Sequence, residues 1–394
     1  MSDSVVIVGA KRTAIGSFLG QFTGVPTTTL GATAIRAALQ QSGIEPADVS
    51  EVFMGCVLPA NLGQAPARQA SLGAGLPVST GCTTINKVCG SGMKAIMLGH
   101  DLIKAGSASI VVAGGMESMT NSPHMVSART GLRYGDAPLV DHMAWDGLTN
   151  PYDGRAMGVF AEQCVDKYSF TREEQDAFSA ESVKRALAAQ QSGVLKDEIV
   201  PVTVKGRKGE TIVDTDEEPA RCDLSKIPTL RPAFKKEGGT VTAASSSSIS
   251  DGAAATVLIG EAEAKRRGLQ PLGRIVAHAT HSQEPEGFTT APVHAIRKLL
   301  DKTGWNVADV DLFEINEAFA VVAMAAAKDL GIPRDKLNVN GGACALGHPI
   351  GATGARLIVT LLHAMEANNL RRGVAALCIG GGEATAIAVE RIVH

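Results

Sequence analysis

The sequence predicts an α/β protein made of two copies of one βαβαβ-type unit, with a longer segment inserted between them. The first sign is an internal repeat: residues 34–43 recur as residues 295–304, at an offset of 261 residues. Residues 111–117 and 377–383 share an apolar run, two glycines and a glutamate two positions later, at an offset of 266. Self-similarity over such a spacing indicates a duplicated structural unit.

Within each copy, short apolar runs alternate with amphipathic segments, which is typical of βαβ units around a sheet covered on both faces. In the first copy we expect strands at residues 5–8, 52–57 and 110–113 and helices near residues 30–42 and 91–105. In the second copy we expect strands at 274–279, 312–315, 338–340 and 375–379 and helices near 292–303, 317–330 and 351–367.

The segment between the copies has a different character. Residues 121–249 are mostly polar and irregular, with one clear helix that starts at Thr171, gains a capping box from Glu174 and ends at Gly193. An insertion of this length on a repeat scaffold usually builds a binding surface. We therefore divide the chain into a first half of residues 1–120 with 250–269, an inserted loop domain of residues 121–249 and a second half of residues 270–394.

Basic residues gather twice in the insertion, at 205–208 and 221–226. Both clusters are candidates for binding phosphates, and a solvated hairpin is the alternative interpretation of 205–208. The four serines at 245–248 are interpreted as a tight loop that enters a strand through the apolar run 253–259.

Composition excludes several classes of protein. The net charge of -3 leaves no whole-protein field for attracting nucleic acid. The 7 cysteines are an odd number and form no CxxC pair, so neither a disulfide framework nor a zinc ribbon is indicated. No long apolar run or signal peptide is found, and we expect a soluble cytoplasmic protein without a membrane partner.

Cys89 follows a polar turn and precedes a small-residue elbow that opens directly into an apolar-periodic helix. Unpaired backbone N–H groups and the positive helix end there favour a thiolate, which suits a nucleophile. The alternative is a buried structural cysteine at a strand–helix junction.

His348 lies in the glycine-dense run 341–356, just before a predicted helix, where small residues allow a substrate to approach. A phosphate loop is the competing interpretation, although the run contains neither Gly-Lys-Ser/Thr nor GxGxxG. Cys378 ends a strand and runs into Gly380, whose neighbouring glycines offer N–H groups to an oxyanion. Asn316 follows another strand, where it is either a site residue or a helix N-cap.

These residues allow more than one chemistry. Cys89, Asn316 and His348 alone fit a cysteine hydrolase, and a zinc site formed with Cys344 and Cys378 is a further alternative whose spacing matches no usual metal pattern. Two thiols, one as nucleophile and one as base, suit an enzyme that holds an acyl group and joins it to a carbanion. The second cysteine therefore favours a thioester substrate and no metal.

Four motifs in this order, at residues 86–96, 316–320, 347–351 and 378–382, resemble the thiolase family over essentially the whole chain. The resemblance implies the thiolase fold, with the two halves forming a layered α/β/α/β/α core. It also implies a homo-oligomer, either a tetramer or a dimer, that acts in fatty acid metabolism. Coenzyme A (CoA) is then a substrate and product, and no cofactor is implied.

The family's scheme, carried onto this chain, makes Cys89 the nucleophile that takes an acetyl group from acetyl-CoA. His348 resembles the residue that removes the Cys89 proton and helps to bind the thioester oxygen. Cys378 resembles the base that takes the α-proton of the second acetyl-CoA, which leads to acetoacetyl-CoA. Asn316 would hold a water in one oxyanion hole, and the N–H groups of Cys89 and Gly380 would form the other.

The resemblance also implies a CoA site and an acyl pocket. Arg221 would lie near the nucleotide, Ser247 near the pantetheine, and Phe234, Ala243, Ala318 and Phe319 along the tunnel. Leu148 and Met157 lie in segments that resemble the acetoacetyl-CoA branch, and we place them in the CoA site as well. Three departures from the pattern concern the same region: Ala156 replaces a histidine, Ser245 and Ser248 replace asparagine and glycine, and Phe288 replaces methionine in the acyl pocket.

The resemblance leaves three functions to compare. The first is the condensation of two acetyl-CoA molecules to acetoacetyl-CoA and CoA, with thiolysis as its reverse. The second is a degradative 3-ketoacyl-CoA thiolase of broader chain length. The third is a non-catalytic lipid carrier, which would have no need for Cys89, His348 and Cys378 together.

Overall fold

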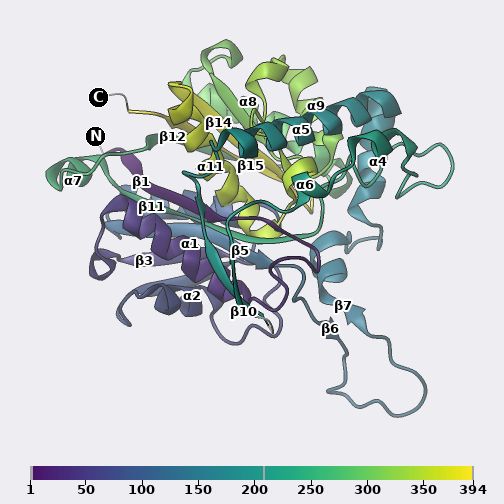
Figure 1. Ribbon diagram of the computed structural model, residues 1–394, viewed down its shortest axis with the longest axis horizontal. Coiled ribbons are helices and arrows are strands. Elements are labelled where there is room, and N and C mark those ends of the chain that lie inside the picture. The colour runs from purple at the N-terminus through teal and green to yellow at the C-terminus, as the bar shows by residue number, and fades with distance from the viewer. Residues whose placement is uncertain (1–2, 207–208, 393–394) are drawn as a thin grey trace.

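The computed structural model describes residues 3–206 and 209–392, and its core is built in five layers (Figure 1). Helices α1 (Thr27–Ser42) and α2 (Pro66–Ala74) form one outer layer, and α8 (Ala291–Thr303) and α9 (Ala320–Leu330) form the other. The middle layer, between two sheets, consists of α3 (Ser91–Lys104) and α11 (Ile350–Ala367). The apolar cluster around Met93, Ile96, Leu357 and Ile358 contains strand residues from both halves. The predicted layered α/β fold is therefore confirmed.

The two halves have sheets of matching strand order. The first runs β1 (Val5–Thr13), β11 (Ser250–Gly260), β5 (Ile110–Ser118), β3 (Glu51–Gly55) and β4 (Gly81–Ile85). The second runs β12 (Gly273–Ser282), β15 (Glu383–Glu390), β14 (Arg372–Ile379) and β13 (Leu312–Ile315). A short antiparallel pairing that includes Val5 with Ile275 joins β1 to β12. The strand orders agree with a duplicated unit, and the residue boundaries of the three domains stay a prediction.

Glycines bring the two middle helices together at their N-terminal ends. A Cβ on Gly92 would lie 2.9 Å from the Ala355 nitrogen, and a Cβ on Gly354 would lie 2.4 Å from the Met93 nitrogen. Both distances are too short for any side chain. Because Cys89 precedes α3 and His348 precedes α11, this contact places the two candidate residues in the same region of the molecule.

The inserted segment contains more regular structure than its sequence predicts. Helix α5 (Arg172–Ser192) is confirmed with its capping box: the Glu174 N–H donates to Thr171 Oγ1, the Thr171 N–H donates to Glu174, and Gly193 ends the helix at φ 80°. A second helix, α4 (Met157–Tyr168), was not expected. Ala156 precedes its first turn and provides no side-chain cap.

The remaining elements are short. The insertion contains β6 (His124–Met125) and β7 (Val140–Asp141), which form a projecting arm in Figure 1, β8 (Ile199–Val200), the hairpin β9 (Val202–Gly206) with β10 (Gly209–Val213), and α6 (Glu218–Arg221). Elsewhere lie β2 (Gly16–Ser17), α7 (Glu261–Arg266) and α10 (Ala343–Leu346). In the 205–208 cluster, Lys205 lies in this hairpin, and Arg207 and Lys208 lie outside the described residues. Among the described residues, none of the helices has the length and apolar character needed to cross a membrane.

Two predicted elements need correction. The strand predicted at 338–340 is wrong: Asn338 has φ 49°, and its side-chain amide exchanges two 2.9 Å hydrogen bonds with the backbone of Ile315. The amide thus takes the place of a backbone ladder. The helix predicted at 317–330 starts only at Ala320, because Phe319 is extended and pairs with Ser246.

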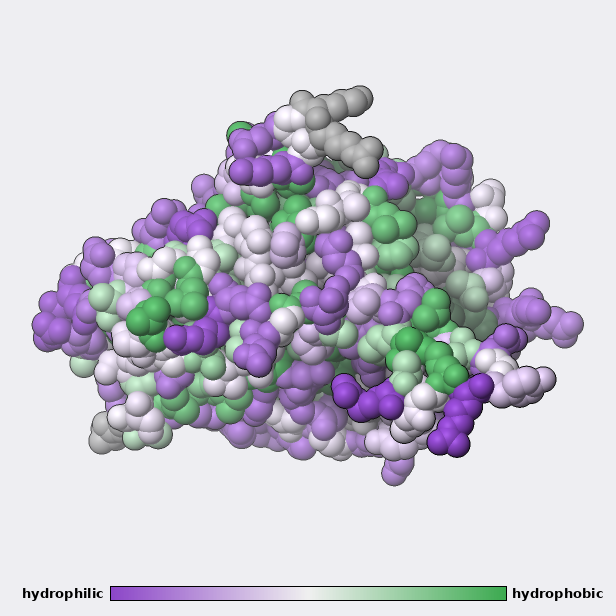
Figure 2. Space-filling view, turned by 90° about the horizontal axis from the view of Figure 1, so that it is seen from below, coloured by the Kyte–Doolittle hydropathy of each residue, from purple (hydrophilic) through white to green (hydrophobic). Residues whose placement is uncertain are grey.

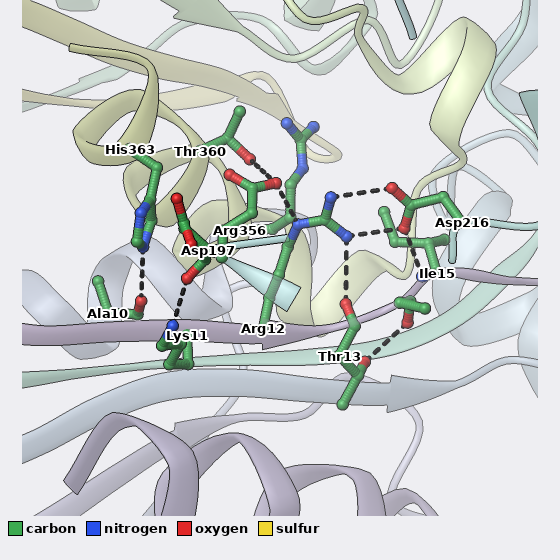
Figure 3. Close-up of polar contacts among 12 residues, drawn as sticks. Ala10, Lys11, Arg12, Thr13, Ile15, Asp197, Asp216, Arg356, Thr360 and His363 are labelled. Carbon is green, nitrogen blue, oxygen red and sulfur yellow. Dashed lines mark hydrogen bonds and ion pairs between the residues drawn. The ribbon is translucent and has the colours of Figure 1, made fainter. Parts of the chain in front are cut away.

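A buried ion network joins the insertion to the first half. Arg12, fully buried on β1, donates to Asp216 at 2.7 and 2.9 Å and to Glu198 at 2.6 Å. Glu198 also accepts a hydrogen bond from Thr360 on α11 at 3.2 Å. Figure 3 shows Arg12 and Asp216 facing each other, with Thr360 on the opposite side.

We expect Arg12→Met to lower the free energy of unfolding by about 3–5 kcal/mol, because it leaves two buried carboxylates without their cation. Urea denaturation followed by circular dichroism measures this change. Arg266→Met is the matched control, since Arg266 pairs with Glu263 at the surface and should matter little. A variant as stable as the control would contradict the role given to the network.

Candidate active site

One cavity collects most of the residues that the sequence points to. It has a volume of about 320 Å³ and lies at the N-terminal ends of α3 and α11. Its lining includes eleven predicted residues: Cys89, Leu148, Met157, Phe234, Ser247, Phe288, Ala318, Phe319, His348, Cys378 and Gly380. Arg221 and Ala243 line a neighbouring hollow, which shares Ser246 and Ser248 with the cavity. Asn316 lies behind His348 and does not line the cavity.

Cys89 stands on a sharp elbow between β4 and α3. Val88 has φ 46°, a conformation that a β-branched residue rarely adopts. Ser91 holds the turn, since its hydroxyl accepts from the Lys87 N–H at 2.8 Å and donates to the Val88 carbonyl at 2.6 Å. A Cβ on Gly90 would lie 2.4 Å from Ile379, so the glycine allows the strand that carries Cys378 to approach.

The protonation state of Cys89 differs from the sequence-based expectation. Burial raises the pKa of the Cys89 thiol to about 11, although the N–H groups of Gly380 and of Cys89 itself act in the opposite direction. The predicted preference for a thiolate is therefore wrong, because the loss of water outweighs the two N–H groups. A neutral thiol needs a base at hand before it becomes a nucleophile.

His348 is held as a neutral base. Its Nδ1 lies 2.6 Å from Thr353 Oγ1, and this hydroxyl donates to the Pro349 carbonyl at 3.0 Å. The hydroxyl therefore accepts from Nδ1–H, which leaves Nε2 unprotonated. Burial, assisted by the charge of Arg356, lowers the pKa of His348 to about 3. The imidazole thus stays uncharged and able to accept a proton at neutral pH.

Asn316 is not a helix cap, because α9 begins four residues later, and its side chain lies beside His348. Its backbone N–H donates to Ala376 at 3.0 Å, which places it at the end of β13. Its Nδ2 lies 3.5 Å from His348 Nε2, and its buried Oδ1 accepts no hydrogen bond from the described residues. The side chain thus faces the basic nitrogen and keeps one polar atom free for a further partner.

Cys378 and Gly380 form the opposite side of the cavity. Cys378 is buried on β14, and burial, followed by the proximity of Cys89, raises the pKa of its thiol well above the usual range. The next residues turn sharply, with φ 92° at Gly381 and 89° at Gly382. This turn follows directly on Gly380, whose N–H faces the Cys89 sulfur. Two thiols and two N–H donors therefore converge on one point.

The residues expected to bind CoA line the approach to the cavity. Ser247 uses both its N–H and its hydroxyl to contact the Ala318 carbonyl, each at 3.0 Å. Ser245 closes the same loop, because its hydroxyl accepts from the Thr242 N–H at 2.8 Å. Arg221 is exposed at the neighbouring hollow and pairs with Glu217 at 3.2 Å.

Sequence reasoning missed two residues that hold the site together, Thr353 and Glu117. Glu117 is buried and accepts N–H bonds from Val57, Leu58 and Gly351 at 2.8–3.1 Å, which fixes the start of α11 beside His348. Burial raises its pKa to about 7 against these three donors. The repeat of residues 111–117 contained a signal for Glu117, whereas no local pattern marks Thr353.

A two-half fold with two thiols, a neutral histidine and paired N–H donors in one cavity defines an acyltransferase. The chain belongs to the thiolase family: the model of the thiolase N-terminal domain matches residues 5–262 and that of the C-terminal domain matches residues 269–391. Among similar proteins, an acetyl-CoA acetyltransferase of Chromobacterium violaceum is 53% identical over 98% of this chain and 99% of its own length.

Other relatives are similar over nearly their whole lengths. A probable acetyl-CoA acetyltransferase of Dictyostelium discoideum is 52% identical, covering 99% of this chain and 94% of the relative. An acetyl-CoA acetyltransferase of Shinella zoogloeoides is 49% identical over 100% of both chains. The family predicted from the four motifs is therefore confirmed.

Proposed function

We propose that this protein is an acetyl-CoA C-acetyltransferase, which joins two acetyl-CoA molecules into acetoacetyl-CoA and CoA and catalyses the reverse thiolysis. The observation that carries the proposal is the convergence of Cys89, Cys378 and the basic Nε2 of His348 on one cavity. The names of the full-length relatives support the same substrate. CoA enters and leaves as a substrate and product, and the proposal includes no cofactor or metal.

The first half-reaction transfers an acetyl group to the enzyme. His348 Nε2 takes the Cys89 proton, and the thiolate attacks the thioester carbon of acetyl-CoA. The negative charge on the carbonyl oxygen is stabilised by the N–H groups of Cys89 and Gly380. The bond to the CoA sulfur then breaks, and the departing thiolate takes the proton from His348.

The second half-reaction forms the carbon–carbon bond. His348 Nε2, unprotonated again once CoA has left, takes the Cys378 proton, and the resulting thiolate takes an α-proton from the second acetyl-CoA. The carbanion then attacks acetyl-Cys89. Because burial raises the pKa of Cys378, its thiolate is a strong base. The thioester oxygen, made negative as the proton leaves, is stabilised by His348 and by a water held on Asn316. The Cys89 thiolate released with acetoacetyl-CoA finally takes the proton held on His348, so that both cysteines end the cycle as thiols.

CoA is proposed to lie along the approach that Ser247, Phe234, Ala318 and Phe319 line, with its nucleotide near Arg221. Arg221 is 56% exposed at its side chain, which leaves it accessible to a phosphate. We place Leu148 and Met157 against the pantetheine and Phe288 against the acetyl group. The largely apolar lining supports a small uncharged acyl group.

We also propose that the protein is a homo-oligomer, a tetramer or a dimer, acting in the cytoplasm in fatty acid metabolism. The arm between β6 and β7 supports the formation of an oligomer, because it projects from the molecule (Figure 1) and exposes Leu132, Tyr134 and Leu139. The face turned to the viewer in Figure 2 likewise mixes apolar and hydrophilic patches. Apolar residues so placed favour burial against another copy.

The test is a substrate panel in the thiolysis direction. With CoA, purified protein is expected to consume acetoacetyl-CoA, measured as loss of its absorbance, and to prefer it over six- and eight-carbon 3-ketoacyl-CoA. Equal or faster cleavage of the longer substrates would favour the degradative thiolase instead. No cleavage of any of them would contradict the enzyme assignment and favour a carrier.

A further inference from the structure

Two walls of the cavity come from segments about a hundred residues apart, and one side chain joins them. The first wall is the loop that carries Gly380 and Gly382. The second is the turn Pro285–Thr290, whose Phe288 is 2% exposed and lines the cavity. Gln283, half-buried at the end of β12 and outside the cavity lining, contacts both.

Gln283 contacts the loop through its backbone. Its N–H donates to the Gly382 carbonyl at 2.8 Å. The packing there is close, because a Cβ on Gly382 would lie 2.3 Å from the Gln283 carbonyl oxygen. Gly382 therefore has to be glycine both for this contact and for its φ of 89°. The backbone of residue 283 thus stays in a fixed place relative to the oxyanion donor at Gly380.

Gln283 contacts the turn through its side chain. Nε2 donates to the Gly287 carbonyl at 2.5 Å and lies 3.0 Å from Thr290 Oγ1. Its Oε1 lies 3.0 Å from His281 Nε2, an arrangement that fixes which end of the amide faces the turn. The amide therefore has hydrogen-bond partners at both ends, and it contacts the Gly287 carbonyl before Phe288 and the Thr290 hydroxyl after it.

The outer side of the same turn is held separately. Glu286 pairs with Arg155 at 2.7 Å, and the Arg155 guanidinium lies 4.7 Å from the centre of the Phe160 ring. Phe160 in turn packs edge-to-face on Phe288, with ring centres 6.4 Å apart. The surface ion pair contributes little by itself, whereas the half-buried amide of Gln283 contacts the turn at two positions.

We propose that Gln283 is a positioning residue that keeps the Phe288 turn and the Gly380 loop in register, and thereby restricts the cavity to short acyl groups. The inference rests on the proposed function, because it concerns the acyl group that this function transfers. Gln283 acts through Phe288 and Gly380 and touches no substrate atom. A small shift of either wall changes both the fit of the acyl chain and the aim of the N–H donor.

The experiment compares Gln283→Met, which keeps the volume and loses the side-chain hydrogen bonds, with wild type. We expect kcat for thiolysis of acetoacetyl-CoA to fall about 10- to 100-fold, since a misplacement of about 1 Å has effects of this size. The KM for CoA should not change, because the residues at the nucleotide are untouched. The rate with a six-carbon 3-ketoacyl-CoA relative to acetoacetyl-CoA should rise.

Three further variants make the test specific. Gln40→Met, at an exposed position on α1, should behave as wild type in every assay. Thr290→Val removes one partner of the amide and should shift the chain-length ratio in the same direction by a smaller factor. In a Phe288→Ala background, Gln283→Met should no longer change that ratio, because the residue through which it acts is absent.

The inference would be overturned if Gln283→Met kept the wild-type kcat and chain-length ratio. It would also be overturned if both substrates slowed equally while the thermal midpoint fell, since that is the result of a merely structural role. Absence of thiolysis by wild type is a different outcome, which contradicts the proposed function itself and the inference with it.

Discussion

Incubated with acetyl-CoA labelled in its acetyl group, Cys378→Ala is expected to acquire label on Cys89 without forming acetoacetyl-CoA, whereas Cys89→Ala acquires none. The first half-reaction needs only Cys89, its base and the N–H donors, and these are intact when Cys378 is replaced. The second half-reaction needs the α-proton to be removed, and Cys378 is the base placed for it. Each replacement should lower overall turnover at least about 10⁴-fold, as the loss of a central group does in other covalent catalysts.

Mass spectrometry of the labelled peptide locates the acetyl group, and the absorbance of acetoacetyl-CoA follows turnover. Cys82→Ala is the matched control, since Cys82 packs against the first-half core and does not line the cavity. It should acetylate and turn over as wild type does. Equal labelling of Cys89→Ala and Cys378→Ala would show that the two roles are assigned to the wrong residues.

His348→Ala is expected to slow acetylation of Cys89 about 10²–10⁴-fold at pH 7, because it removes the neutral imidazole that is proposed to accept the proton of the Cys89 thiol. Its residual rate should rise about tenfold per pH unit between pH 7 and 9, as the fraction of thiolate grows below a pKa of about 11. Wild type should behave differently. Its His348, with a pKa of about 3, stays unprotonated, so loss of this base does not limit the rate as the pH falls from 8 to 5.

Stopped-flow measurement of CoA release over this pH range tests both profiles. Gln40→Ala, at an exposed position on α1 that does not line the cavity, serves as a control for handling at each pH. A wild-type rate that fell steeply below pH 7 would mean that His348 titrates near its ordinary pKa and would contradict its role as a neutral base. A pH-independent His348→Ala rate would mean that Cys89 reacts as a preformed thiolate.

The principal features of the fold follow from local patterns. The repeated segments at 34–43 and 295–304 became α1 and α8, the outer helices of equivalent position in the two halves. Thr171 and Glu174 formed their capping box because both partners lie within one turn of helix. The strand at 338–340 was predicted wrongly because a contact between distant segments decides its conformation. Its alternating polar and apolar residues suit a strand, but the Asn338 side-chain amide hydrogen-bonds to the backbone of Ile315 on β13.

The residues of the site likewise divide into those that a local sequence pattern marks and those that it does not. Cys89 and His348 each stand in a glycine-rich turn, Cys378 lies at the end of a strand that runs into one, and the cavity brings the three together. Thr353 and Gln283 carry no such mark, because a threonine in the first turn of a helix and a glutamine after a strand are ordinary surface patterns. Their roles depend on a 2.6 Å contact with His348 in one case and on two separate walls in the other.

Sequence alone was therefore sufficient for the duplication, the layered α/β class, the family and the choice of candidate residues that share the cavity, because turns, caps and periodicity act between near neighbours. Tertiary structure was required for the protonation states of Cys89 and His348 and for the alignment of the cavity walls. Desolvation depends on every group that packs around an atom, whatever its place in the chain. Desolvation reverses the thiolate preference that the local elbow favours at Cys89, and it keeps the His348 imidazole uncharged.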